Sequence, residues 1–178
     1  MEIISLNSLL EADESEGRDV HSYLSSFNCE INHDVENFLH EKAIDSEKRG
    51  FTRTTLVIDE KQNNDIVGYF TLMVKNFDFL DVSGTNRKKL TGDKRATTFI
   101  TILIAQLGRS DLYKGKVSGS EILEFALERC SMVNELSAIK IACVEYEEND
   151  KLIEFYKGND FQQIQKNESG YIISYVRL

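Results

Sequence analysis

The sequence predicts one α/β domain over residues 1–178, with a mixed, mostly antiparallel central sheet flanked by helices. Runs of β-branched and aromatic residues alternate along the chain with segments of helical periodicity. No repeat, linker or change of composition divides the chain. A length of 178 residues, of which 41% are hydrophobic and 29% charged, suits a single globular core.

The first forty residues predict a short apolar start, a loop and two short helices. Segment 11–17 is acidic and has no hydrophobic period, which is typical of a solvated loop. Asn32 or Asp34 is available as the N-cap of the second helix. The apolar residues at helical spacing are Val20, Tyr23, Leu24 and Phe27, then Val35, Phe38 and Leu39.

Three β-branched and aromatic runs predict the first strands of the sheet. Segments 54–58 and 66–74 are separated by the turn-rich segment 59–65, which predicts a β-hairpin with a loop longer than two residues. A polar stretch that includes 86–95 follows. Segment 97–104 is apolar enough for a central strand.

The second half of the chain predicts alternating helices and strands. The run 105–123 indicates a buried strand that passes through a basic, glycine-bearing turn into an amphipathic helix. That helix has one apolar stripe, formed by Ile122, Leu123, Ala126, Leu127, Cys130 and Val133. A strand over 139–144, a short helix over 150–157 and a final strand over 171–176 follow.

The junction between strand and helix is a candidate anion site. The first N–H groups of a helix lack partners within it, and the peptide dipoles leave partial positive charge at that end. Gly115 and Gly119 allow close approach of the backbone, while Lys114 and Lys116 add charge. An ordinary helix start is the alternative, because Ser118 followed by Glu121 has the spacing of a capping box.

Composition narrows the class of protein. No apolar stretch approaches the roughly 18 residues that span a bilayer, and no targeting segment precedes the first strand, so we expect a cytoplasmic protein without a membrane partner. A net charge of -9 argues against a surface that binds nucleic acid throughout, although a local basic patch remains open. The cysteines, Cys29, Cys130 and Cys143, lack CxxC spacing and predict neither zinc nor disulfides.

With these elements in order, the chain resembles the GNAT superfamily of acyl-CoA-dependent N-acyltransferases over most of its length. The segment 114–119, KGKVSG, is similar to the acetyl-CoA motif Gln/Arg-x-x-Gly-x-Gly/Ala of that family. Its last glycine, Gly119, fits the motif, whereas Lys114 replaces the leading Gln/Arg and Val117 replaces the first glycine. A β-branched residue resists positive φ, so Val117 needs a negative φ or a different turn.

Two further segments carry the resemblance. The run 149–161, NDKLIEFYKGNDF, is similar to the later GNAT motif of Asn, then Phe-Tyr, then a glycine turn and Phe. The segments 27–29, 34–39 and 68–72 resemble the branch of toxins that acetylate aminoacyl-tRNA.

The resemblance implies an N-acetyltransferase that uses acetyl-CoA as acyl donor. It also implies that the strand ending at Leu107 and Arg109 splays from its neighbour and exposes main-chain groups to the pantetheine arm and the acetyl carbonyl. A backbone N–H there would stabilise the developing oxyanion. The residues expected to bind acetyl-CoA are Leu107, Arg109, Lys114, Gly115, Lys116, Val117, Ser118, Gly119, Ser120 and Asn149.

The resemblance places the general acid at Tyr156, which a pKa of about 10 keeps protonated at neutral pH. The alternative is a core aromatic, since Tyr156 shares a helical face with Leu152 and Ile153. Glu145 is a candidate base, acting directly or through water, or else a solvated carboxylate at a strand end. Asn149 either caps the helix after it or contacts the pantetheine.

The acceptor and partners stay open at the level of sequence. The basic cluster of Arg87, Lys88, Lys89, Lys94 and Arg95 is either a solvated loop or a contact for the CoA 3′-phosphate or an RNA acceptor. No histidine pair has zincin spacing, so no metal is predicted. A homodimer is one open arrangement, and an antitoxin partner is neither required nor excluded.

Three functions are therefore distinguished. The first is transfer of an acetyl group to a primary amine of unknown identity, by direct attack on the thioester. The second is toxin-like acetylation of aminoacyl-tRNA. The third is a non-catalytic, regulatory module that binds acyl-CoA, which the departures at Lys114 and Val117 and the lack of a clear base motivate.

Overall fold

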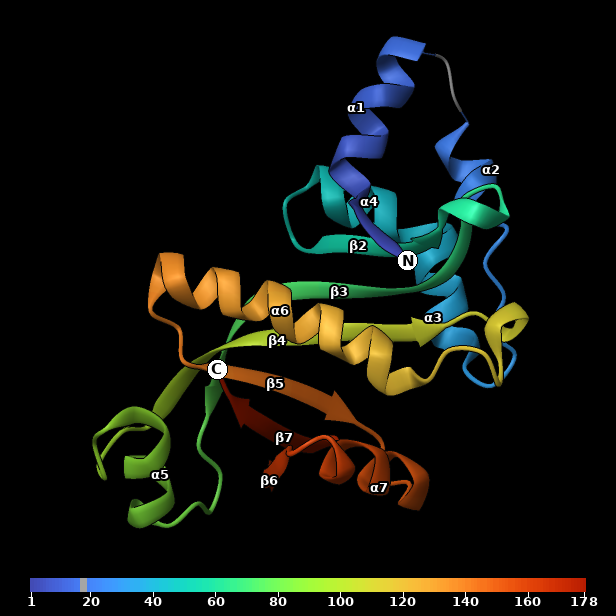
Figure 1. Ribbon diagram of the computed structural model, residues 1–178. Coiled ribbons are helices and arrows are strands. Elements are labelled where there is room, and N and C mark those ends of the chain that lie inside the picture. The colour runs from blue at the N-terminus through green and yellow to red at the C-terminus, as the bar shows by residue number, and fades with distance from the viewer. Residues whose placement is uncertain (17–18) are drawn as a thin grey trace. The chain divides into compact units, whose positions relative to one another are not determined.

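A computed structural model describes residues 1–16 and 19–178 (Figure 1). Its strands are β1 (Glu2–Ser5), β2 (Arg53–Asp59), β3 (Asp65–Asp78), β4 (Thr98–Arg109), β5 (Ile141–Tyr146), β6 (Gln162–Lys166) and β7 (Ile172–Arg177). Its α-helices are α1 (Leu6–Glu16), α2 (Val20–Leu24), α3 (His33–Asn37), α4 (Ala43–Lys48), α5 (Gly84–Thr91), α6 (Gly119–Ser137) and α7 (Asp150–Gly158). A π-helical turn, η1 (Phe38–Lys42), and two 3₁₀ turns, η2 (Glu60–Gln62) and η3 (Asp111–Tyr113), complete the described elements.

The strands form a seven-stranded mixed sheet in the order β1-β2-β3-β4-β5-β7-β6. Pairing is antiparallel for β1 with β2, β2 with β3, β5 with β7, and β6 with β7. β4 and β5 pair in parallel. The predicted sheet and the predicted hairpin of β2 and β3 are thus confirmed.

The chain comprises two compact units. The first unit contains residues 1–73 and 106–126, and the second contains 74–105 and 127–178. The border falls inside β3, β4 and α6, so each of these elements contributes one part to each unit.

The first unit holds an apolar core built by α1 to α4 on the strands β2 and β3. The ring of Phe27 packs edge-on against that of Tyr69 at 5.3 Å, and the Tyr69 hydroxyl donates to the Val35 carbonyl. Two strands approach closely here, because a Cβ on Gly68 would lie 2.6 Å from the carbonyl oxygen of Gly108. Only glycine fits at this point without a shift of backbone.

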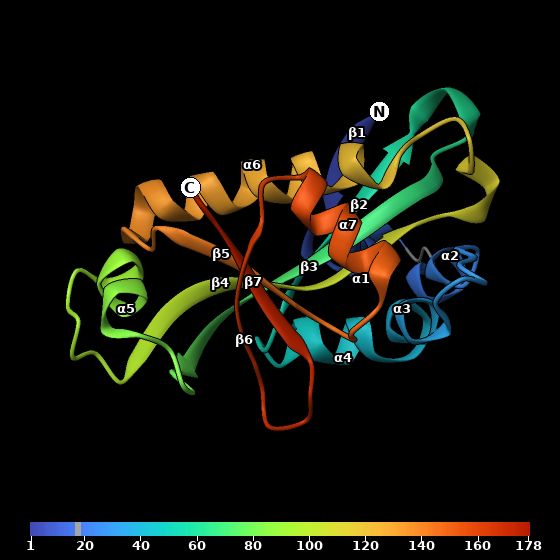
Figure 2. The same cartoon turned by 90° about the horizontal axis from the view of Figure 1, so that it is seen from below.

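The second unit contains the strands β5, β7 and β6, with β7 between the other two, and the helices α5 and α7 (Figure 2). Stacked phenylalanines support the segment that carries α5: the Phe99 ring lies 5.5 Å from Phe77 and 4.8 Å from Phe79. Arg87 fastens α5 to this base, since its guanidinium donates to the carbonyls of Val82 and Ala96. These hydrogen bonds hold in place the helix that carries the neighbouring cations.

Several sequence predictions need correction. The loop predicted over 11–17 is wrong for residues 11–16, which continue α1; residue 17 lies outside the described residues. The strand β6 and the helices α4 and α5 were not predicted. Over residues 1–16 and 19–178, no helix is long and apolar enough to cross a membrane.

Candidate functional site

Parallel pairing between β4 and β5 is short. Ile102 pairs with Ala142 and Leu103 with Cys143, and within the described residues the ladder goes no further. β5 nevertheless continues to Tyr146, paired with β7 on its other side. Ile104 and Ala105 thus extend beyond the parallel ladder, and the facing edge of β5 keeps main-chain groups available for another partner.

The turn after β4 is fixed by its own hydrogen bonds. The carbonyl of Tyr113 accepts the N–H groups of both Lys116 and Val117, and the Arg109 guanidinium donates to the Val117 carbonyl at 3.1 Å. Val117 is buried and keeps a negative φ, whereas Gly115 takes the left-handed conformation at φ +77°. The valine therefore fits the turn without backbone strain.

The capping box at the start of α6 is formed. The Ser118 N–H donates to Glu121 Oε2 at 2.7 Å, and the Glu121 N–H donates to Ser118 Oγ at 3.2 Å. These hydrogen bonds lower the pKa of the Glu121 carboxyl. The N–H groups of Gly119 and Ser120 have no partner among residues 1–16 and 19–178, so two donors at the positive end of α6 are free to bind an anion.

The predicted cofactor residues other than Asn149 all lie in the first unit. The main chain of Leu107 and Arg109 belongs to the end of β4, and the segment 114–120 forms the turn and the first residues of α6. Lys114 and Lys116 are exposed, and neither forms an ion pair with a described residue. This unit thus brings two free N–H groups and two cations into one turn.

Tyr156, Glu145 and Asn149 lie in the second unit. Tyr156 is 9% exposed and belongs to an aromatic cluster, with ring centroids 4.7 Å from Tyr146 and 5.5 Å from Phe161. Burial raises the pKa of its phenol above the ordinary value, with the nearby Tyr146 as a smaller cause. Among the described residues nothing accepts a hydrogen bond from the Tyr156 hydroxyl, so the packed ring presents an uncommitted proton.

Glu145 stands near the end of β5 with both carboxylate oxygens engaged. Oε2 forms an ion pair with Lys75 Nζ at 2.7 Å, and Oε1 accepts from the Asn167 side-chain amide. A carboxylate in this position is half-buried rather than solvated. The Lys75 ammonium also lies 4.5 Å above the Phe77 ring, which fixes the lysine in turn.

Asn149 is the N-cap of α7. Its side-chain oxygen accepts the N–H of Lys151 at 2.9 Å. This bond sets the start of the helix that carries Tyr156.

The basic cluster is only partly helical, since Arg87, Lys88 and Lys89 lie in α5 whereas Lys94 and Arg95 lie in the turn after it. Arg87 is committed to the fold by the bonds described above. Lys88, Lys89, Lys94 and Arg95 are exposed and form no ion pair with any described residue.

Sequence reasoning missed the neighbours that surround the candidate catalytic groups. Tyr146 stacks on Tyr156 and shares a hydrogen bond of 3.0 Å with Ser174 Oγ, and Lys75 and Asn167 hold Glu145. Only the place of Tyr146, directly after Glu145 at a strand end, offered a signal. In the part of the chain that the structure describes, no group of three or more metal-ligating side chains gathers.

Comparisons with known proteins agree on the fold. No protein-family model matches the chain, and no curated protein sequence is significantly similar to it. Solved structures of bacterial toxins do match. A structure of AtaT with acetyl-methionyl-tRNAfMet superposes with a TM-score of 0.68 at 18% identity, over 84% of this chain and 85% of that one.

Two more matches extend the comparison. A tyrosine-to-phenylalanine mutant of KacT has a TM-score of 0.69 at 18% identity, with 85% of each chain covered. A structure of AtaTR with acetyl-CoA has a TM-score of 0.69 at 15% identity, over 99% of this chain and 92% of that one. The chain therefore has the GNAT-type fold of these toxins, as the motifs predicted.

Proposed function

We propose that this protein is an acetyl-CoA-dependent N-acetyltransferase whose acceptor is the amino group of an aminoacyl-tRNA. The observation that carries the proposal is the early end of the β4–β5 ladder within a fold shared with AtaT. AtaT structures contain acetyl-CoA or acetyl-methionyl-tRNAfMet, which are the donor and a product of such a reaction.

The first unit suits the donor. The free N–H groups of Gly119 and Ser120 can bind a pyrophosphate, with Lys114 and Lys116 adding positive charge. The main chain near Leu107 and Arg109 is the proposed contact for the pantetheine arm. When bound, acetyl-CoA supplies an acetyl group activated as a thioester.

The reaction needs few side chains. The neutral amine attacks the thioester carbonyl; the new C–N bond forms and the C–S bond breaks. The attacking nitrogen loses one proton to water, and the departing thiolate gains one. We assign the second proton to the Tyr156 hydroxyl, which is protonated and free to donate; the resulting phenolate regains its proton from solvent.

Glu145 has a different proposed role. To accept a proton it must give up its ion pair with Lys75, so the amine is proposed to arrive neutral from solution. Glu145 instead positions Asn167 and Lys75 at the end of β5.

A transfer assay tests this function. The purified protein is given radiolabelled acetyl-CoA and a mixture of aminoacyl-tRNAs, and acetylated product and released thiol are measured. Tyr156→Phe is expected to lower kcat by about 100-fold or more, with acetyl-CoA affinity nearly unchanged. Tyr171→Phe is the matched control, since it removes a hydroxyl from an exposed tyrosine of the same unit and should keep full activity.

The outcomes separate the alternatives. Acetyl-CoA binding without transfer to any amine would indicate the regulatory module instead. Transfer to small amines but to no aminoacyl-tRNA would support N-acetyltransferase activity and contradict aminoacyl-tRNA as the acceptor. In cells, expression of the wild-type protein should arrest translation, and Tyr156→Phe should relieve the arrest.

A further inference from the structure

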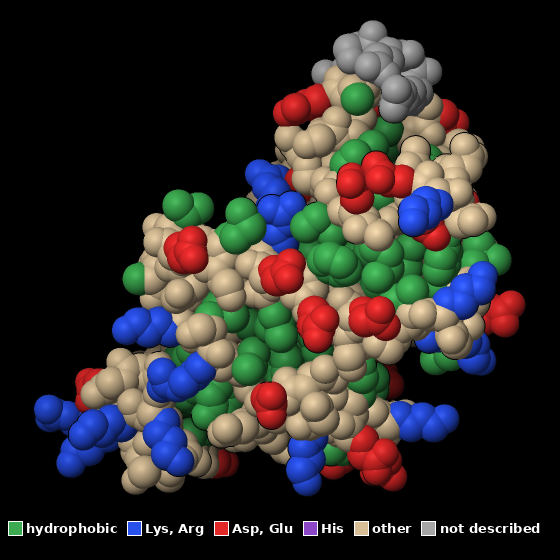
Figure 3. All heavy atoms as spheres, viewed as in Figure 1, with side chains coloured by type: hydrophobic (Ala, Val, Ile, Leu, Met, Phe, Trp, Pro, Cys, Tyr) green, Lys and Arg blue, Asp and Glu red, His purple; other side chains and the backbone are tan. Residues whose placement is uncertain are grey.

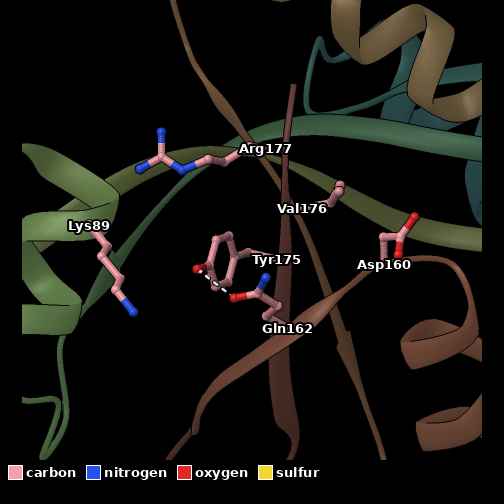
Figure 4. A pocket seen from close by; sticks show the side chains of 6 residues that line it. All are labelled: Lys89, Asp160, Gln162, Tyr175, Val176 and Arg177. Carbon is pink, nitrogen blue, oxygen red and sulfur yellow. Dashed lines mark hydrogen bonds between the residues drawn. The ribbon is translucent and has the colours of Figure 1, made fainter.

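A hollow of about 460 Å³ lies in the second unit, beside α5 and the β6–β7 pair (Figure 4). Its lining is basic and aromatic, with a single carboxylate. The lining residues are Lys89, Asp160, Gln162, Tyr175, Val176 and Arg177. The volume is within the range of about 300 to 1,000 Å³ of pockets that bind small ligands.

Two unpaired cations border this hollow. Lys89 comes from α5, and Arg177 ends β7 with its side chain extended toward α5 (Figure 4). Both are exposed, and neither forms an ion pair with a described residue. Their positive charge is available to a phosphate.

The surroundings extend the positive charge. Lys88, Lys94 and Arg95 are also exposed and form no ion pair with a described residue, and lysine and arginine side chains gather over α5 (Figure 3). The whole protein carries a net charge of -9, so this surface is a local exception. Such a patch attracts a polyanion selectively to one place on an otherwise repelling molecule.

An aromatic ring, that of Tyr175, lies beside Lys89 and Arg177 in the lining of the hollow (Figure 4). Tyr175 is half-buried, and its hydroxyl donates to Gln162 Oε1 at 3.1 Å, which fixes the ring. Nucleic-acid bases stack on such rings without regard to sequence. A phosphate site next to an ordered aromatic ring matches the two parts of one nucleotide.

We propose that this hollow binds a nucleotide of the acceptor RNA, with its phosphate between Lys89 and Arg177 and its base on Tyr175. The inference rests on the proposed function, which supplies a tRNA as acceptor. Asp160, the lining carboxylate, adds a negative charge that weakens the attraction of the hollow for a phosphate. The hollow therefore contributes affinity for the body of the RNA and no chemistry.

Fluorescence anisotropy with labelled tRNA tests the cations. Lys89→Ala with Arg177→Ala is expected to weaken binding about tenfold or more at 0.15 M salt. The slope of log K against log salt should fall by about 1.4 to 1.8, for two lost phosphate contacts. Lys48→Ala with Lys61→Ala removes the same charge from exposed sites in the first unit and should change affinity less than about twofold.

Two further variants test the ring and the carboxylate. Tyr175→Ala should weaken tRNA binding by about fivefold or more, while Tyr175→Phe, which keeps the ring, should retain it. Asp160→Asn should tighten binding. Equal affinity of Tyr175→Ala and Tyr175→Phe would overturn the stacking role.

Kinetics distinguish this inference from the proposed function. In the Lys89→Ala/Arg177→Ala protein, KM for aminoacyl-tRNA should rise while kcat and KM for acetyl-CoA stay unchanged. If the wild-type protein acetylates aminoacyl-tRNA and this variant has the same KM for aminoacyl-tRNA as the Lys48→Ala/Lys61→Ala control, the hollow does not bind the RNA. The proposed function then stands. If the wild-type protein acetylates no aminoacyl-tRNA, the proposed function is rejected. Whether the hollow binds RNA is then judged from the tRNA-binding measurements alone.

Discussion

Tyr156 combines burial with an uncommitted hydroxyl. In an ordinary core a buried phenol finds a hydrogen-bond partner, as Tyr69 does at the Val35 carbonyl and Tyr146 does at the Ser174 hydroxyl. Tyr156 is buried to about the same degree as Tyr146, but its hydroxyl has no acceptor among the described residues. A hydroxyl without such a partner is what the proposed role of general acid requires.

The raised pKa of Tyr156 gives a pH prediction. Because burial moves this pKa upward, the phenol stays protonated well above pH 10. Activity should rise as the acceptor amine loses its proton near pH 8 and should then stay level to about pH 10. The measurement is kcat/KM against pH with an amide-linked aminoacyl nucleoside that resists hydrolysis. A decline centred below pH 10 would contradict the assignment of Tyr156 as acid.

Glu121 carries a negative charge at the place proposed for the pyrophosphate. The glutamate completes the capping box, yet its charge opposes an incoming anion. Glu121→Gln keeps an oxygen that can accept the Ser118 N–H and removes the charge. We expect acetyl-CoA to bind about two- to fivefold more tightly, measured by calorimetry.

Glu124→Gln is the control for that change. This exposed residue lies one turn further along α6, and its loss of charge should leave acetyl-CoA affinity nearly the same. Equal tightening in both variants would indicate a general charge effect instead of a site at the capping box.

At the level of elements, the approach of β3 and β4 depends on Gly68. Gly68→Ala would place a Cβ 2.6 Å from a backbone oxygen and 2.9 Å from Ile122, so strands or helix must move. The expected loss is about 1 to 3 kcal/mol in the free energy of unfolding, measured by urea titration. Gly158→Ala has open space around it and should keep or slightly raise stability.

Sequence patterns predicted the elements with a strong apolar period and missed elements with few apolar residues. The core strands and α6 were predicted because their hydrophobic periods are strong. β6 reads QQIQK, with Ile164 as its one apolar residue, and is ordered by pairing with β7. α5 has only Leu90 as an apolar residue and is defined by the Ser83 cap and by Gly92 at φ +84°.

In the candidate site, the contacts between residues close in sequence differ from those between distant residues in how far they could be predicted. The capping box, the cap at Asn149 and the turn at Gly115 are local, so residue spacing could indicate the turn and offer each cap as one of two alternatives. The partners of Glu145 come from positions 75 and 167, far away along the chain. Spacing carries no information about such partners, because only the folded sheet brings them together.

On the scale of the whole molecule, the two compact units are not joined by a linker. The chain passes from one to the other within β3, β4 and α6, each of which is continuous. We expect residues 1–178 to unfold in one cooperative step. Hydrogen exchange in increasing urea, followed by mass spectrometry on peptides from each unit, should give coincident midpoints. Separated midpoints would contradict the prediction of a single domain.

The place of β7 in the sheet has a consequence for synthesis. β7 follows the other strands along the chain, yet it lies between β5 and β6 and pairs with both. While the ribosome is still making residues 172–177, β5 lacks its antiparallel neighbour and β6 lacks its only one among the described strands. Tyr146, whose ring packs against Tyr156, gains its hydrogen bond with Ser174 only when β7 has been made, so the support of the Tyr156 ring is completed late in translation.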